Sequence, residues 1–182
     1  ASARAARRVA AERRLRRARL PGLAILRAPG IYDSAGRLPI ERLRRGTPAL
    51  SPADDVHTNH IHADDLAAAC LAAIYRGRPN RVYHAVDDTE LKMGDYFDQV
   101  ADALALPRPP RLDRATIESR VSPALLSFMS ESRRLTNHRL TRELRLRLRY
   151  PQVADALREA VGLVQSQASP ESSADISGDP PV

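Results

Sequence analysis

The sequence has one cysteine, one lysine and no tryptophan, and only 4% of its 182 residues are aromatic. The single cysteine, Cys70, excludes an intrachain disulfide and fits a reducing compartment. No apolar run approaches the roughly 20 residues that cross a bilayer. No charged segment followed by an apolar one suggests a signal peptide. These absences predict a soluble, cytoplasmic protein with no membrane partner.

Arginine supplies nearly all of the positive charge. The net charge is +7, the isoelectric point is about 10.4, and Lys92 is the only lysine. Such a surface suits nucleic acid or an acidic partner. However, no zinc-finger, RNP or helix-turn-helix signature is present, and few aromatic side chains are available to stack on bases. We therefore expect solvated helix faces without a nucleic-acid partner, and keep a non-catalytic basic interaction module as the alternative function.

Apolar periodicity and turn residues predict short strands between helices. We expect strands over residues 23–27, 56–61 and 81–86, with a loop over 28–37. We expect helices over residues 3–19, 39–45, 65–77, 93–106, 114–131 (interrupted near Pro123), 137–144 and 152–164. This alternation predicts an α/β fold, but three short strands make a thin sheet. We expect residues 165–182 to be disordered.

The stretch HTNHIHADD, residues 57–65, combines three histidines with two aspartates. In an extended segment His60 and His62 share a face, and such a pair can hold zinc or iron. Asp64 or Asp65 could be a third ligand, but neither Cys70 nor any other cluster completes the set, so we predict no metal. Asp64 or a close neighbour is expected to cap the following helix. At the carboxyl end of a strand, the histidines can also line a ligand cleft.

Three segments in order resemble the later part of the NAD-dependent epimerase/dehydratase group, the extended short-chain dehydrogenases/reductases. They are ILRAPGIY (25–32), NHIHADDLAAAC (59–70) and RVYHAVDD (81–88). The resemblance implies an incomplete Rossmann-like parallel sheet in residues 1–106, interleaved with substrate-side segments. It also implies a helical substrate-binding subdomain in residues 107–164. Ile25, Ile61 and Val82 should then lie side by side in parallel strands.

The resemblance further implies NAD or NADP as cofactor, a small-molecule substrate and two groups of site residues. Backbone contacts with the nicotinamide would come from Pro29, Gly30 and Ile31. The substrate side would be lined by Tyr32, His60, His62, Arg133 and Arg134. Arg27 would pin a loop.

The family's catalytic signatures are missing. No two glycines are spaced for its dinucleotide-binding turn. No Tyr-x-x-x-Lys pair exists either, because Asp88 stands four residues before Lys92; in an alignment of the first helix, Arg4 and Arg8 take the Tyr and Lys positions. We therefore expect no catalytic residue, poor dinucleotide binding and no turnover by this chain alone. The sequence leaves open whether the natural product includes an upstream dinucleotide-binding half, and it also leaves a homodimer open.

Overall fold

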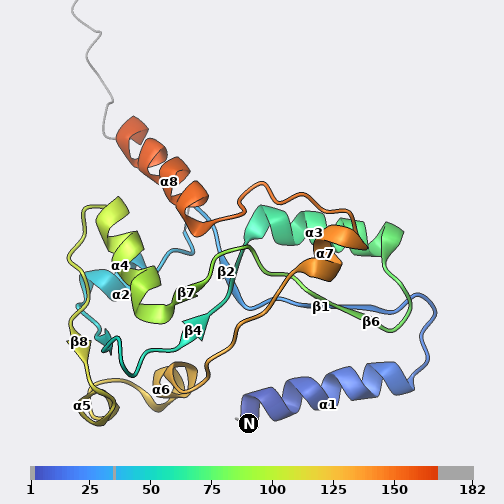
Figure 1. Cartoon of the computed structure of the whole chain (residues 1–182), viewed down its shortest axis with the longest axis horizontal. Helices are drawn as coiled ribbons and strands as arrows, with labels where there is room; N and C mark the ends of the chain where they lie inside the picture. Colours follow the sequence, from blue (N-terminus) through green and yellow to red (C-terminus); the bar gives the residue numbers. More distant parts are fainter. Residues whose placement is uncertain (1–2, 35, 168–182) are drawn as a thin grey trace, which may run out of the picture.

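The computed structural model describes residues 3–34 and 36–167, which fold into short strands and eight helices (Figure 1). The helices are α1 (Ala3–Arg17), α2 (Ile40–Arg44), α3 (Ala63–Arg76), α4 (Met93–Ala103), α5 (Arg114–Glu118), α6 (Pro123–Met129), α7 (His138–Arg142) and α8 (Val153–Gln167). The strands are β1 (Ala24–Arg27), β2 (Gly30–Tyr32), β3 (Ala49–Leu50), β4 (His57–Thr58), β5 (His60–His62), β6 (Arg81–His84), β7 (Leu91–Lys92) and β8 (Arg111–Leu112).

The strands associate in pairs. β1 and β6 are parallel with Ile25 opposite Val82, as predicted. β2 and β5 are also parallel, but here Ile61 lies opposite Ile31 in a separate pair, so the expectation of one row with Ile25, Ile61 and Val82 was wrong. The predicted loop over 28–37 contains β2, because Gly30–Tyr32 forms a ladder with the buried strand β5. Two further pairs join β3 with β8 and β4 with β7.

Several helix boundaries follow from local chemistry. The helix predicted over 114–131 is divided into α5 and α6, and Pro123 occupies the first position of α6 after the cap Ser122. The helix expected to end at Gly46 is α2, and Gly46 has a φ of 60° directly beyond its last cap residue. Glycine adopts this left-handed conformation without steric cost. Proline at the start of α6 and glycine after α2 therefore explain why the sequence predicted these two boundaries well.

Helices α1 and α3 lie on opposite sides of the β1–β6 pair (Figure 1). The inner face of α3 packs through Ala69 and Ala73 into a cluster with Tyr83 and with leucines of the α7 region. Gly77 allows the end of α3 to approach β1, because a Cβ there would lie 2.9 Å from the Cβ of Ala24. Small side chains therefore set the close distance between helix and strand.

The largest apolar cluster combines residues from both sides of the predicted boundary at residue 106. Tyr32 and Phe97 meet Tyr150 and Val153 there, and α4 packs against α8. The domain division thus stays a prediction. Helix α8 continues to Gln167, so residues 165–167 of the predicted tail are helical, and the rest of that tail lies outside the described residues. No described helix is long and apolar enough to span a membrane.

Candidate functional site

Strands β2 and β5 form the centre of the candidate site. Their parallel register places Gly30 opposite His60 and Tyr32 opposite His62. Tyr32, His60 and His62 are only 1%, 5% and 4% exposed. Three of the predicted substrate-side residues therefore come together, in the interior of the protein.

Tyr32 and Asp87 form a buried hydrogen-bonded pair. The Tyr32 hydroxyl donates to Oδ2 of Asp87 at 3.1 Å, and Oδ1 of Asp87 accepts from the amide of Thr89 at 3.0 Å. Burial raises the pKa of Asp87 to about 7, although its hydrogen bonds act in the opposite direction. Burial, followed by the nearby Asp87 charge, also raises the pKa of Tyr32. Tyr32 is therefore neutral at physiological pH, and its hydroxyl proton takes part in the hydrogen bond to Asp87.

Aromatic rings enclose both histidines of β5. His60 lies 4.1 Å from the ring centroid of Tyr96, and His62 lies 3.8 Å from that of Tyr150, both with tilted planes. Burial lowers the pKa of His60 to about 4, so its imidazole is neutral near pH 7. Nδ1 of His60 and Nε2 of His62 are buried without a hydrogen-bond partner in the described part of the chain. These two nitrogens of β5 are buried polar atoms that no described residue uses.

Residues of the HTNHIHADD stretch stabilise the first turn of α3. His62 is the N-cap residue, and its Nδ1 accepts from the amide of Asp64 at 3.2 Å. The cap is thus a close neighbour of Asp64, as the prediction allowed. Asp65 is buried and accepts from the amides of Arg149 and Tyr150 at 2.8 and 2.9 Å. It therefore ties the segment before α8 to the start of α3.

The predicted arginines occupy other positions. Arg133 and Arg134 are exposed on the surface, where Arg133 pairs with Glu131 and Arg134 contacts Glu90 at 2.5 Å. Their guanidinium groups are paired with these carboxylates, and only the amide of Arg133 reaches the histidine stretch, donating to the carbonyl of His57. Their role toward a substrate stays a prediction.

Arg27 links the end of β1 to α1. Its guanidinium makes a bidentate contact with Glu12, at 2.9 to 3.1 Å. We expected Arg27 to pin a loop, and it pins a helix. Arg4, at the position of the family's tyrosine, has its guanidinium carbon 3.6 Å from the ring centroid of Phe128. A cation–π contact therefore holds the first turn of α1.

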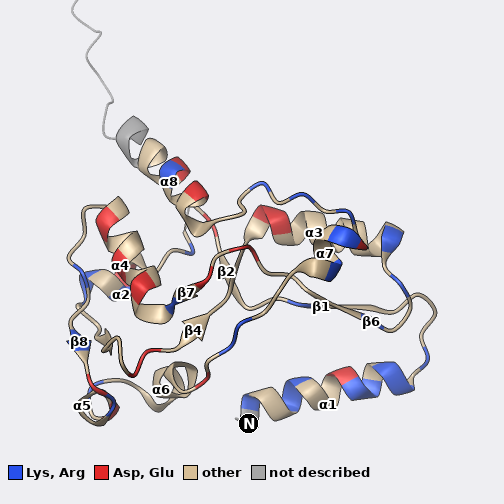
Figure 2. Ribbon diagram, in the orientation of Figure 1, with Lys and Arg blue, Asp and Glu red and all other residues tan. Residues whose placement is uncertain are grey.

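Sequence reasoning missed a second ionic cluster, centred on Arg111. Its guanidinium contacts Asp98 at 2.7 Å, and Asp55 and Asp95 at 3.2 Å each (acidic segments in red, Figure 2). A Cβ at Gly94 would lie 1.4 Å from Nη1 of Arg111, so only glycine leaves room for this guanidinium. The cluster joins segments up to 56 residues apart in sequence, and no local pattern predicts that.

Asp87 was also missed as a site residue, although it lies three residues beyond the end of β6 within the family-like segment RVYHAVDD. An acid just beyond a strand end was the available signal. Within residues 3–34 and 36–167, no three His, Cys, Asp or Glu side chains meet in a group that could hold a metal. The metal hypothesis for His60 and His62 thus gains no third ligand there.

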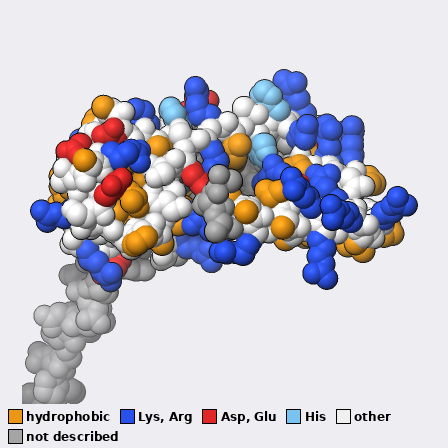
Figure 3. All heavy atoms as spheres, turned by 90° about the horizontal axis from the view of Figure 1, so that it is seen from below, with side chains coloured by type: hydrophobic (Ala, Val, Ile, Leu, Met, Phe, Trp, Pro, Cys, Tyr) orange, Lys and Arg blue, Asp and Glu red, His pale blue; other side chains and the backbone are white. Residues whose placement is uncertain are grey.

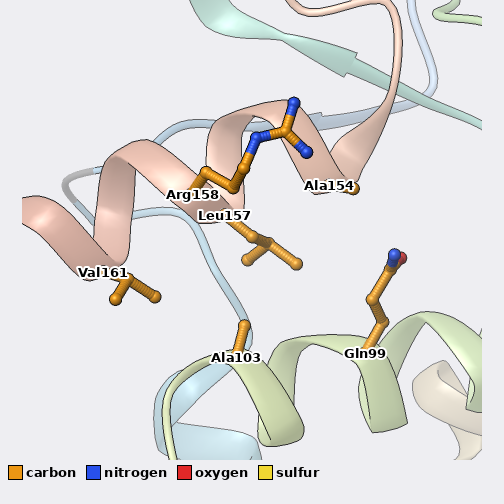
Figure 4. A pocket seen from close by; sticks show the side chains of 6 residues that line it. All are labelled: Gln99, Ala103, Ala154, Leu157, Arg158 and Val161. Atoms are coloured by element: carbon orange, nitrogen blue, oxygen red, sulfur yellow. The ribbon is translucent and has the colours of Figure 1, made fainter.

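Two surface cavities lie away from the histidines. One, of about 380 Å³, lies between α4 and α8, where Gln99 and Ala103 face Leu157 and Val161 (Figure 4). The other, of about 480 Å³, is lined by both Arg45 and Arg120. Tyr32, His60 and His62 line neither cavity, and whether they face a substrate stays a prediction.

Comparison with solved structures places this geometry in a known fold. A functionally unknown conserved protein from Silicibacter pomeroyi DSS is 30% identical, with a TM-score of 0.75 over 92% of this chain and 57% of that one. The human epimerase family protein SDR39U1, solved with NADPH, is 19% identical, with a TM-score of 0.64 over 80% of this chain and 51% of its own. PA4631, a nucleoside-diphosphate-sugar epimerase from Pseudomonas aeruginosa, is 20% identical, with a TM-score of 0.67 over 87% and 53%.

The chain thus spans little more than half the length of these proteins. No protein-family model and no curated protein matches it. The described residues are α/β with parallel strand pairs and share their fold with part of epimerase-family structures. This supports the predicted partial Rossmann-like fold.

Proposed function

We propose that these residues form the C-terminal, substrate-binding part of an NAD(P)-dependent epimerase/dehydratase-like oxidoreductase. The observation that carries the proposal is the β2–β5 register, which pairs Gly30 with His60 and Tyr32 with His62. It brings the backbone assigned to the nicotinamide beside the side chains assigned to the substrate. Two structural neighbours support this class of ligand, because the human protein was solved with NADPH and the Pseudomonas protein is a nucleoside-diphosphate-sugar epimerase.

Gly30 is packed closely against Asn59 and His60 on one side and is exposed on the other. A Cβ at Gly30 would lie 3.2 Å from both the Asn59 carbonyl oxygen and Cδ2 of His60. Gly30 itself is exposed, so the backbone there is open to a ligand. In the proposal, Pro29, Gly30 and Ile31 contact the nicotinamide through their backbone.

The buried polar side chains would position ligands and would not transfer protons. His60 is neutral at pH 7 because burial lowers its pKa to about 4. The hydroxyl of Tyr32 already donates to Asp87. We therefore assign no catalytic residue to these segments, and expect this chain alone to bind dinucleotide weakly and to show no turnover, because its sequence offers no glycine-rich cradle for pyrophosphate.

Backbone amide NMR tests the cofactor side. NADPH and NADH are titrated separately to millimolar concentration into the 15N-labelled chain. The amides of Gly30 and Ile31 should shift, while that of Leu163 on α8 should not. The variant Gly30→Val, whose side chain would press on the Asn59 carbonyl and on His60 and shift the backbone there, should lose the response, and its own spectrum reports whether it is folded. Absent shifts at Gly30 and Ile31, or an unchanged response in a folded variant, would contradict the proposal.

The substrate side is tested with UDP-glucose as a nucleoside diphosphate sugar. Arg134 is paired with Glu90, so an anionic substrate must displace that carboxylate. The variant Glu90→Gln should therefore strengthen UDP-glucose shifts at the Arg133 and Arg134 amides. The matched variant Glu41→Gln, which frees Arg45 on α2 instead, should not. Equal behaviour of the two variants argues against the arginine assignment.

A second candidate function rests on α1. Glu12 is the only acid in this helix and turns toward Arg16 and Arg27. Arg7, Arg14 and Arg17 recur at helical spacing and are exposed. Figure 3 shows arginine side chains crowded on the face seen from below, the side of α1 in Figure 1. If this surface binds nucleic acid, affinity for a duplex oligonucleotide should fall steeply as salt rises, whereas the oxidoreductase proposal expects little affinity at any salt.

A further inference from the structure

The outward face of α3 carries an apolar stripe, formed by Leu71, Ile74 and Tyr75. These side chains are 59%, 75% and 83% exposed, the three highest values among the large apolar residues that the structure describes. At 3.6 residues per turn they lie within about 100° of one another around the helix axis. Large apolar side chains grouped on a surface mark contact sites more often than isolated ones do.

The apolar stripe points away from the rest of the protein. On the opposite side of α3, Ala69, Ala72 and Ala73 are buried against Tyr83 and the leucines of the α7 region. Neither of the two surface cavities described above is lined by a residue of α3. Because its side chains project from a single helix, the stripe is convex, and it suits insertion into a partner better than capture of one.

An arginine row, formed by Arg145, Arg147 and Arg149, follows α7 in the sequence. The chain alternates there, with Leu146 and Leu148 packed on the apolar cluster under α3 and the arginines exposed between them. Figure 2 shows arginine positions in blue along this segment between α7 and α8. Among the described residues, the ion pairs of the row involve Arg149 alone. The guanidinium groups of Arg145 and Arg147 are therefore available to a partner.

Both ends of the arginine row are fixed against α3. At the C-terminal end of the helix, Nη1 of Arg76 donates to the carbonyl of Leu144 at 2.9 Å. At its N-terminal end, Asp65 accepts from the amide of Arg149 at 2.8 Å. The segment 144–149 therefore runs antiparallel along α3, as Figure 1 shows.

The row lies on the side of α3 that Leu71 and Tyr75 share. The guanidinium of Arg149 also pairs with Asp64 at 3.6 Å. At 3.6 residues per turn, Asp64 lies within about 20° of Leu71 and of Tyr75 around the helix axis. The arginine row therefore borders the apolar stripe.

We propose that the apolar stripe and the arginine row together bind the surface of an anionic lipid bilayer. The stripe would enter the boundary between head groups and acyl chains, a region in which tyrosine is enriched. Arg145 and Arg147 would lie at the phosphates, with their apolar stems beside the stripe. Charge complementarity carries the choice of partner, because these guanidinium groups have no carboxylate of their own among the described residues and adjoin side chains that an apolar medium stabilises.

This contact would be peripheral. The sequence predicted no membrane partner because it has no spanning segment, and contact with a bilayer surface requires none. The other arginine-rich surface, on α1, lies on the opposite side of the β1–β6 pair (Figure 1), so one bilayer face cannot contact both. The inference is independent of the proposed function, and α1 provides matched controls.

Co-sedimentation of the complete chain with vesicles tests the inference. One set of vesicles contains equal parts of phosphatidylcholine and phosphatidylserine, and the other contains phosphatidylcholine alone. Cys70 is the only thiol and is exposed about one turn before Ile74, so it can carry an environment-sensitive fluorophore. We expect binding to the anionic vesicles only, with the emission from Cys70 shifted to shorter wavelength.

The contribution of charge is measured with two double variants of equal net charge. Arg145→Ser with Arg147→Ser should weaken binding to the anionic vesicles about 25-fold, because each arginine near an anionic membrane contributes about fivefold. Arg14→Ser with Arg17→Ser, at exposed positions of α1, should weaken it by less than about twofold, because salt screens distant charges. Circular dichroism checks that both variants are folded.

The contribution of the apolar stripe is measured in the same way. Ile74→Ser should weaken binding to the anionic vesicles about tenfold, because the isoleucine no longer enters the bilayer. Leu15→Ser, at a leucine of α1 that is 46% exposed, should leave the binding unchanged.

The inference is overturned if the wild-type chain binds neither set of vesicles. It is also overturned if the chain binds without a change in Cys70 emission, or if the α1 variants weaken binding equally, because charge alone then holds the protein. Two further results would assign the surface to another occupant and overturn the inference as well. One is a dimer of the chain alone in which Cys70 is shielded from a maleimide. The other is a shift of Cys70 emission with poly-glutamate together with no vesicle binding.

Discussion

The two longer parallel strand pairs of this protein have contrasting surroundings. β5 is buried along its length, and tyrosines from α4 and the segment before α8 close over its histidines. β1 is only partly buried and has an edge that no strand of the described residues pairs with. The same local geometry thus serves as completed core in one pair and as an open surface in the other. The difference lies in what distant segments bring to each pair, since the strands themselves are equally apolar at Ile61 and Ile25.

The largest effect should separate these two isoleucines. Ile61 is fully buried, so Ile61→Ala should lower the free energy of unfolding by about 4 kcal/mol, the cost of lost burial plus a cavity. Ile25 is half-buried, so Ile25→Ala should cost about 1 to 2 kcal/mol. Urea unfolding followed by circular dichroism measures both. Equal losses would mean that the two pairs are equally enclosed.

A second test uses the pH dependence created by the enclosed pair. The pKa of Asp87 is raised from 3.8 to about 7 in the folded protein. The folded state therefore holds a proton that the unfolded state has lost, and the contribution of Asp87 to stability falls as pH rises from about 4 to about 7. Three pH units correspond to about 4 kcal/mol. Asp87→Asn should remove this contribution, so that the stability of the variant falls toward acid pH, whereas Asn at the exposed neighbour Asp88 should leave the wild-type pH dependence unchanged.

The opposite slope should come from His60. Its pKa is lowered from 6.5 to about 4, so the unfolded state binds a proton first and stability falls as pH drops from about 6.5 to about 4. This contribution of His60 to the free energy of unfolding is about 3 kcal/mol. The stability of the wild-type protein should therefore change little between about pH 4 and about pH 6.5, because the contributions of Asp87 and His60 compensate. His60→Gln should reveal the Asp87 slope, while His138→Gln on the exposed side of α7 should leave the profile flat; a flat profile in His60→Gln would contradict the assignment.

The sequence predicted the elements that depend on local signals. Helix boundaries were predicted well where a local residue sets them, as at Pro123, at Gly46 and in the Ala-rich run of α3. Capping residues and helix breakers act within one turn, so their effect can be read from the local sequence. β2 was missed because three residues carry no periodicity, and only pairing with β5 makes them a strand. The burial of His60 beneath Tyr96 and the Arg111 cluster depend on residues tens of positions apart. Neither composition nor residue spacing indicates such long-range contacts, so the polar interior of the site could not be predicted.

The smallest effect on stability is expected at the exposed side of α3, in contrast to the buried strand β5. Ile74 is 75% exposed in this chain, so Ile74→Ser should change the free energy of unfolding by less than about 0.5 kcal/mol. A surface isoleucine with no role should also be replaceable without any other consequence. Urea unfolding of both proteins measures this difference, and a large loss of stability in Ile74→Ser would show that Ile74 belongs to the core of the protein.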